Sequence, residues 1–130
     1  MLQAYPIIIT PDDSMFIVTI PDFNLNTQGR DVPEAIFMAR DAIGLMAIDN
    51  EDDGIANPAP SPISSMKKIK ADEILTLVDV DFAEYRRQND LRTVRRNCSL
   101  PAWLDAEANK AKINVSAVLQ NALKQELHLA

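Results

Sequence analysis

The first part of the chain alternates between short apolar runs and turn-forming residues. Apolar runs at 5–9 and 15–20 are rich in β-branched side chains, and a polar, proline-containing segment at 10–14 separates them. This pattern predicts a β-hairpin. Pro21-Asp22 ends the second run, and we expect a short third strand around Leu25 and Thr27.

A helical pattern follows. Asp31-Val32-Pro33-Glu34 has the form of a capping box with proline in the first turn. Apolar residues then recur with the period of a helix: Ala35, Ile36, Ala39, Ile43, Met46 and Ala47. We expect the acidic run 49–54 to end this helix near Ile48.

Three prolines within 57–64 predict an extended segment without regular structure. The apolar run 74–80 is long enough for a strand, buried in the sheet if both faces are covered. Asp81-Phe82-Ala83-Glu84 repeats the capping pattern and predicts a short helix to about Arg87. Residues 88–91 would then join two modules.

The last third predicts a strand followed by two helices. Residues 94–100 form an alternating run that predicts a strand. Pro101 follows this run and marks the point where the strand ends and a helix begins. One face of that strand would carry Val94, Cys98 and Leu100, and the other Arg95, Asn97 and Ser99. A polar turn at 112–114 divides two helical patterns, whose apolar positions are Leu104, Ala108 and Ala111, then Val115, Val118, Leu119, Ala122, Leu123 and Leu127. Asn114 is the expected N-cap of the second helix.

This segment needs a partner, because about 35 residues cannot bury enough apolar surface to fold alone and a lone strand leaves its backbone groups unpaired. The simplest partner is a second copy, which would pair the two strands into an antiparallel ribbon. A two-stranded ribbon fits the major groove of DNA, where Arg reads guanine, Asn reads adenine and Ser serves either. The alternative is a solvated edge strand.

The stretch RRNCSLPAWLDAEANKAKINVSAVLQNAL resembles the ribbon-helix-helix family of DNA-binding proteins. The resemblance implies base reading by Arg95, Asn97 and Ser99. It implies phosphate binding at the start of the second helix, by Asn114, Val115 and Ser116. The implied dimer core is Val94, Cys98, Leu100, Leu104, Val118, Leu119, Ala122 and Leu123. Arg96 departs from the family, which has an inward apolar residue there; either its charged end reaches solvent or the register is shifted by one.

Charge is divided unevenly along the chain. The whole chain carries a formal net charge of −6, but residues 92–127 hold six basic and three acidic groups, a balance of +3. The remainder holds seven basic and sixteen acidic groups, a balance of −9. This split favours a weakly basic DNA-binding module attached to an acidic domain that binds a basic partner.

Composition excludes several classes of protein. No apolar stretch is long enough to span a bilayer and residues 1–11 do not form a signal peptide, so we expect a cytoplasmic protein with no membrane partner. Cys98 is the single cysteine and His128 the single histidine. A single cysteine excludes an internal disulfide and a cysteine-built zinc site, and His128 is expected to be a solvated residue near the C-terminus, so we expect no metal and no cofactor.

The order YPIIITPDDSMFIVTIPDFNLNTQG, then DVPEA, then the proline segment resembles the HicB family of bacterial antitoxins. The resemblance implies an α+β fold with a partial ribonuclease-H-like domain (antiparallel sheet plus helix) at 1–80, a short helix and linker at 81–91, and a ribbon-helix-helix module at 92–130. It implies an antitoxin that binds and neutralises a HicA toxin, a small basic ribonuclease that cuts messenger RNA. The C-terminal homodimer would repress its own operon by binding operator DNA, and association into a higher oligomer is left open. Here Leu25-Asn26 replaces the family's frequent Gly-Cys, and the double glycine of the hairpin turn is absent.

An enzyme is the alternative, because ribonuclease-H chemistry uses several carboxylates to hold two divalent ions. The acidic domain supplies Asp12, Asp13, Asp22, Asp49, Asp52, Asp53, Asp79 and Asp81. Most of them fall at expected turns, caps or helix ends, where acids are common for structural reasons. We therefore expect no catalytic residues. The second hypothesis is a transcriptional regulator whose acidic domain binds another ligand or retains metal-dependent nuclease activity.

Overall fold

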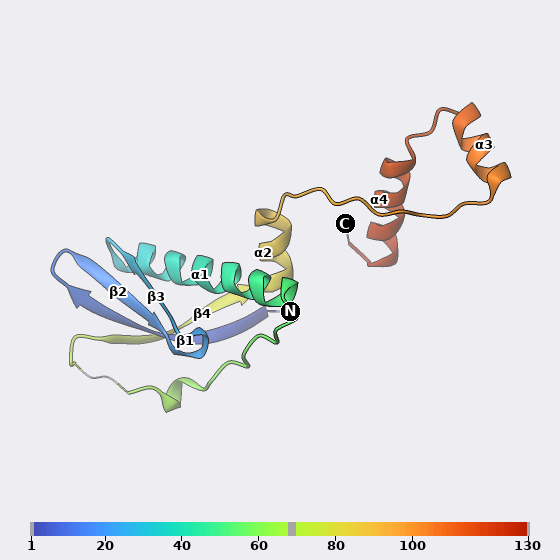
Figure 1. Cartoon of the computed structure of the whole chain (residues 1–130). Coiled ribbons are helices and arrows are strands. Elements are labelled where there is room, and N and C mark those ends of the chain that lie inside the picture. The colour runs from blue at the N-terminus through green and yellow to red at the C-terminus, as the bar shows by residue number, and fades with distance from the viewer. Residues whose placement is uncertain (1, 68–69, 130) are drawn as a thin grey trace. The chain divides into compact units, whose positions relative to one another are not determined.

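The computed structural model describes residues 2–67 and 70–129. It is an α+β structure in which a four-stranded antiparallel sheet is combined with helices (Figure 1). The chain divides into two compact units, Met1–Arg92 and Thr93–Ala130. Each unit is described by itself.

The sheet of the N-terminal unit has the strand order β3-β2-β1-β4, and every neighbouring pair is antiparallel. β1 (Leu2–Asp12) and β2 (Met15–Ile20) form the predicted hairpin, but β1 continues to Asp12 and leaves a two-residue turn. Asp13 in this turn has a φ of 53°, a left-handed conformation that Asp tolerates better than most residues. After a 3-10 turn, η1 (Pro21–Phe23), the expected third strand is β3 (Leu25–Gly29).

The core lies between the sheet and α1 (Val32–Asp52). The face of the sheet toward α1 carries side chains that have less than a twentieth of their surface exposed: Tyr5, Ile7, Ile9, Val18, Ile20, Val78 and Val80. The α1 side contributes Ala35, Ala39 and Ile43. Small alanines let the helix axis approach the strands closely. At the junction of β3 and α1, a Cβ on Gly29 would lie 2.8 Å from the Cα of Ala35, so this position requires glycine.

α1 begins as predicted. The side chain of Asp31 accepts a hydrogen bond from the backbone N–H of Glu34 at 2.8 Å. The Glu34 carboxylate accepts from the backbone N–H of Arg30 at 3.2 Å, one residue before the usual capping-box donor. The predicted end near Ile48 is wrong, because α1 runs four residues further, to Asp52.

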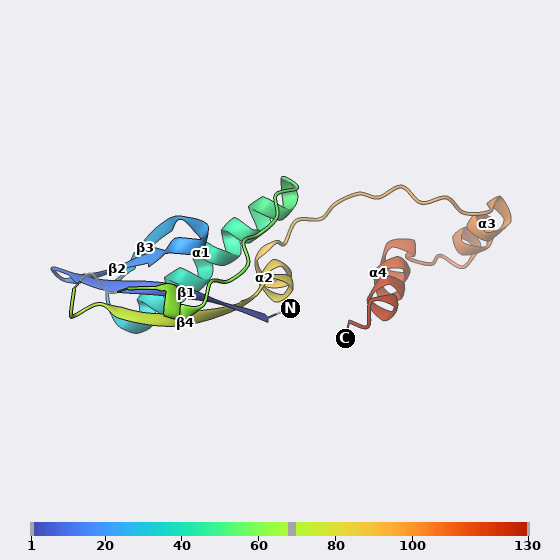
Figure 2. The same ribbon diagram turned by 90° about the horizontal axis from the view of Figure 1, so that it is seen from below.

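The proline segment crosses the other face of the sheet (Figures 1 and 2). It has no regular structure apart from a 3-10 turn, η2 (Ile63–Ser65), which contacts β4. Two hydrogen bonds fix its course: the Tyr5 hydroxyl donates to the Pro58 carbonyl at 2.7 Å, and the Ser61 hydroxyl donates to Asp22 at 2.6 Å. The expected extended segment is therefore tied to the sheet.

β4 (Ile74–Asp81) is an edge strand. Val78 and Val80 are buried, but Leu77 is 47% exposed, so the strand is not covered on both faces. α2 (Phe82–Asn89) follows and is capped as predicted, with Asp81 accepting from the Glu84 N–H at 3.2 Å. α2 contacts α1 through the ring of Tyr85, since a Cβ on Gly44 would lie 2.6 Å from that ring.

The C-terminal unit consists of α3 (Ala102–Lys110) and α4 (Val115–Glu126). Pro101 precedes α3, and the side chain of Asn114 caps α4 by accepting from the Ala117 N–H at 3.1 Å, both as predicted. Lys112 turns the chain between the helices with a φ of 52°. Residues 90–101 have no regular structure.

Candidate functional site

The C-terminal unit leaves its apolar side chains uncovered. No residue of α3 or α4 is buried. The eight side chains predicted to form a dimer core are all exposed in the single chain: Val94, Cys98, Leu100, Leu104, Val118, Leu119, Ala122 and Leu123. An amphipathic helix of a stable unit normally buries its apolar stripe. Two helices with exposed stripes therefore form an incomplete core, and they require a further surface to cover them.

The three predicted base-reading residues lie in the extended segment before α3. Arg95, Asn97 and Ser99 are all exposed, and within the described chain no hydrogen bond or ion pair holds their side chains. The segment 94–100 forms no strand with the described parts of its own chain. The prediction concerned pairing between two copies, so a single chain does not test it. These side chains are free to bind a ligand.

The start of α4 has the chemistry of an anion site. Asn114 occupies the N-cap, and its side chain satisfies only the Ala117 N–H. Val115 and Ser116 form the first turn, where backbone N–H groups have no intrahelical acceptor. The helix dipole adds a partial positive charge there. All three predicted phosphate-binding residues are exposed.

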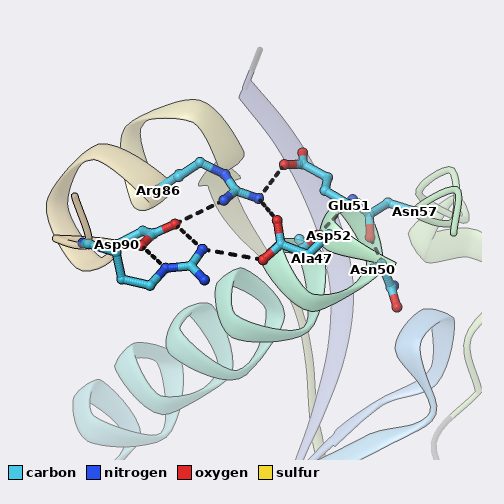
Figure 3. A network of polar contacts seen from close by, with 8 residues as sticks. Ala47, Asn50, Glu51, Asp52, Asn57, Arg86 and Asp90 are labelled. Atoms are coloured by element: carbon cyan, nitrogen blue, oxygen red, sulfur yellow. Dashed lines mark hydrogen bonds and ion pairs between the residues drawn. The ribbon is translucent and has the colours of Figure 1, made fainter. Parts of the chain in front are cut away.

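A cluster of charged side chains joins α1, α2 and the residues that follow α2 (Figure 3). We call it the arginine–carboxylate cluster; its members are Glu51, Asp52, Arg86, Asp90 and Arg92. Arg86 donates to Glu51 at 3.0 Å, to Asp52 at 3.2 Å and to Asp90 at 3.0 Å. Arg92 donates to both oxygens of Asp90, at 2.7 and 2.8 Å, and lies 3.5 Å from Asp52.

The electrostatics of this cluster explain why α1 extends beyond Ile48, its predicted end, to Asp52. Acidic residues at a helix C-terminus are unfavourable, because the dipole is negative there. Two guanidinium groups beside Glu51 and Asp52 offset that repulsion. The hydrogen bonds from Arg92 hold the pKa of Asp90 well below its usual range, and the hydrogen bond to Glu51 raises the pKa of Arg86. Local sequence patterns did not predict this cluster, although Arg86 and Asp90 have the i,i+4 spacing of a helical ion pair.

A groove of about 190 Å³ lies between α1 and α2, lined by Phe37, Arg40, Asp41, Tyr85, Gln88 and Asn89. The Tyr85 hydroxyl donates to Asp41 at 2.7 Å. Burial, followed by this hydrogen bond, raises the pKa of Tyr85. The lining provides no nucleophile with an adjacent base, and a tyrosine with a raised pKa stays protonated. The described lining of this groove therefore shows no catalytic arrangement.

Apart from Glu51, Asp52 and Asp90, which are held by arginines in the arginine–carboxylate cluster, the carboxylates of the N-terminal unit do not converge. Asp22 binds Ser61, Asp79 pairs with Arg40 at 2.9 Å, and Asp81 caps α2. Across residues 2–67 and 70–129, no group of three or more His, Cys, Asp or Glu side chains could hold a metal ion. The same ranges include no helix with the length and apolarity that crossing a bilayer would need.

Comparison with known proteins gives one family and two related structures. Residues 5–123 match the family described as HicB-like antitoxin of bacterial toxin-antitoxin system. A structure described as a toxin-antitoxin complex from Streptococcus pneumoniae is similar at 24% identity and a TM-score of 0.60, with 97% of this chain and 99% of that chain covered. The antitoxin HicB of Burkholderia pseudomallei is similar at 26% identity and a TM-score of 0.56, with 97% of each chain covered. No curated protein matches the chain.

Proposed function

Because this chain belongs to the HicB-like antitoxin family of bacterial toxin-antitoxin systems, we propose that it neutralises a HicA-type toxin and represses its own operon. The N-terminal unit would bind the toxin, a small basic ribonuclease that cuts messenger RNA. The C-terminal unit would bind operator DNA as a homodimer. Proteins of this family are antitoxins and typically not enzymes.

The observation that carries the proposal is the division of charge and packing between the two units. Met1–Arg92 has its own core and holds sixteen acidic against eight basic side chains, a net −8. Thr93–Ala130 holds five basic against three acidic side chains, a net +2, and buries none of the residues of its helices. The N-terminal unit is therefore acidic and has a complete core. The C-terminal unit is basic and its core is incomplete.

Toxin binding is supported by the charge of the complete unit. An acidic surface attracts a basic protein, accelerates their encounter and competes with the negatively charged RNA that such a toxin binds. We propose that the sheet of this unit, with α1 on one face, is a partial ribonuclease-H-like domain that serves as a binding scaffold.

Dimerisation and DNA binding are supported by the incomplete unit. Pairing segment 94–100 with its copy would satisfy the free backbone groups of both strands and place the uncovered stripes of α3 and α4 against each other. That arrangement is a ribbon-helix-helix dimer. Arg95, Asn97 and Ser99 would project from the ribbon into the major groove. Asn114, Val115 and Ser116 would bind backbone phosphates at the start of α4.

Co-expression of the full chain with the neighbouring reading frame tests the proposal. We expect a small basic protein to co-purify, and we expect the complex to retard a DNA fragment carrying the start of the operon. A second preparation that lacks residues 93–130 should retain the basic protein and lose the DNA. Loss of the basic protein from that truncated chain would contradict the assignment of toxin binding to the N-terminal unit.

A further inference from the structure

The chain leaves the N-terminal unit through the arginine–carboxylate cluster. Arg92, the last residue of the unit, is held by two hydrogen bonds to Asp90 at 2.7 and 2.8 Å. It also lies 3.5 Å from Asp52, at the end of α1. The Arg92 backbone N–H also donates to Asp90, at 3.4 Å, and Asp90 accepts a further hydrogen bond from Arg86 of α2, at 3.0 Å. The exit point is thus tied to both helices.

Charge is the main force that holds this exit point. Leu91 and Val94 are 81% and 80% exposed, so apolar packing does not fix the segment. The Asp90 side chain is only 15% exposed and the Arg86 side chain 31%, which places the centre of the cluster partly out of water. Isolated surface ion pairs contribute little, but several charges that share carboxylates in good geometry contribute more. The segment 90–92 therefore depends on these ion pairs.

We propose that the arginine–carboxylate cluster is a latch that fixes the exit of the chain at Arg92 and so shortens the free tether that leads to the DNA-binding segment. The consequence for DNA rests on the proposed function, in which residues 94–100 form the ribbon. With the latch closed, Thr93 is then the one residue between the latch at Arg92 and the proposed ribbon. Opening the latch frees residues 90–92 as well.

The length of the free segment affects the electrostatic repulsion between the N-terminal unit and DNA. Three extended residues span about 10 Å, which is close to the Debye length of about 10 Å at 0.1 M salt. Each N-terminal unit carries a net −8 and repels DNA phosphates. A closed latch therefore weakens operator binding, and an open latch relieves that repulsion.

Asp52→Asn is the decisive variant, because it removes a carboxylate shared by Arg86 and Arg92 without changing the sequence of α2 or the tether. Asp53→Asn is the matched control. It makes the same change in charge one residue further on, at a side chain that has no ion pair with the described residues.

The first readout is the rate at which trypsin cleaves the full chain after Arg92, followed by mass spectrometry. Cleavage requires local release of residues 90–92, so Asp52→Asn should raise the rate about three- to ten-fold, and Asp53→Asn should leave it unchanged. Equal rates in the two variants would overturn the latch. This readout needs neither DNA nor a dimer.

The second readout is the affinity of the full chain for a DNA fragment carrying the start of its operon. A Gly-Ser-Gly insertion between Arg92 and Thr93 imitates the open latch without removing any charge. The insertion and Asp52→Asn should each bind this DNA about two- to five-fold more tightly than Asp53→Asn at 0.1 M salt, and the difference should vanish at 0.5 M. Equal affinities at 0.1 M would overturn the effect of the latch on DNA binding. A native chain that bound no operator DNA would instead refute the proposed function, and the trypsin result would still decide whether the latch exists.

Discussion

Leu123→Ala tests whether the uncovered face of α4 is the dimer interface. In the single chain Leu123 is 48% exposed, so roughly half of its side chain remains to be covered by a partner. Burying a whole leucine side chain contributes about 1.5–3 kcal/mol. Covering the remaining half would then contribute about 0.8–1.5 kcal/mol per chain, and about twice that in a symmetric dimer.

The expected result is a dimer dissociation constant about 10- to 100-fold higher than that of the native chain. Sedimentation over a series of protein concentrations measures this constant directly. Lys124→Ala is the control, because it truncates the next residue of α4 without removing apolar surface, and its dissociation constant should stay within about threefold of the native value.

Three results would refute the reasoning. An unchanged dissociation constant for Leu123→Ala would place the interface on another surface. A native chain that stayed monomeric at the highest concentration would remove the dimer altogether, and with it the proposed ribbon. Destabilisation that was independent of concentration would mean that Leu123 packs mainly within its own unit.

Asn97→Ala should lose about 1–3 kcal/mol of discrimination at one base position while the dimer persists, as measured by binding to operators changed one base pair at a time; an equal loss on every sequence would contradict base reading. Gly44→Ala should destabilise the N-terminal unit by about 1–3 kcal/mol in urea unfolding, because its Cβ would lie 2.6 Å from the Tyr85 ring, and unchanged stability would show that Tyr85 can move aside. The pKa of Asp90 is depressed below its ordinary value of 3.8, so its contribution to stability is present above that pH and is lost as the pH falls toward the depressed value. Asp90→Asn should therefore flatten the acid side of the stability profile measured by circular dichroism, and an identical profile would mean that Asp90 is paired equally in the unfolded chain.

Local patterns predicted most elements of the N-terminal unit. The hairpin, the third strand and the capped starts of α1 and α2 all depend on residues within a few positions of one another. Asp31, for example, caps α1 through the N–H of Glu34, three residues away. Side-chain alternation and capping are local interactions, so the order of residues records them directly.

In the C-terminal unit, local patterns predict the elements but not the surface that covers them. Its two helices and the Asn114 cap follow from the sequence, and so does the apolar stripe of α4. The described residues of the chain cover that stripe only in part, since Leu119 and Leu123 remain 36% and 48% exposed, so a second surface must complete the cover. The assignments of Arg95, Asn97 and Ser99 to bases, and of Asn114, Val115 and Ser116 to phosphates, therefore remain predictions.

The sequence by itself determined the order of the elements in the N-terminal unit, where its helices begin, which faces are apolar, and how charge is shared along the chain. Only the tertiary structure decided that α1 extends to Asp52, that β4 lies at an edge with Leu77 exposed, and that Arg86 and Arg92 meet carboxylates some 35 to 40 positions earlier in the chain. The physical reason is the range of the interactions. Caps and periodicity act between near neighbours in the chain, whereas the neutralisation of an acidic helix end and the covering of a strand depend on groups that meet only after folding.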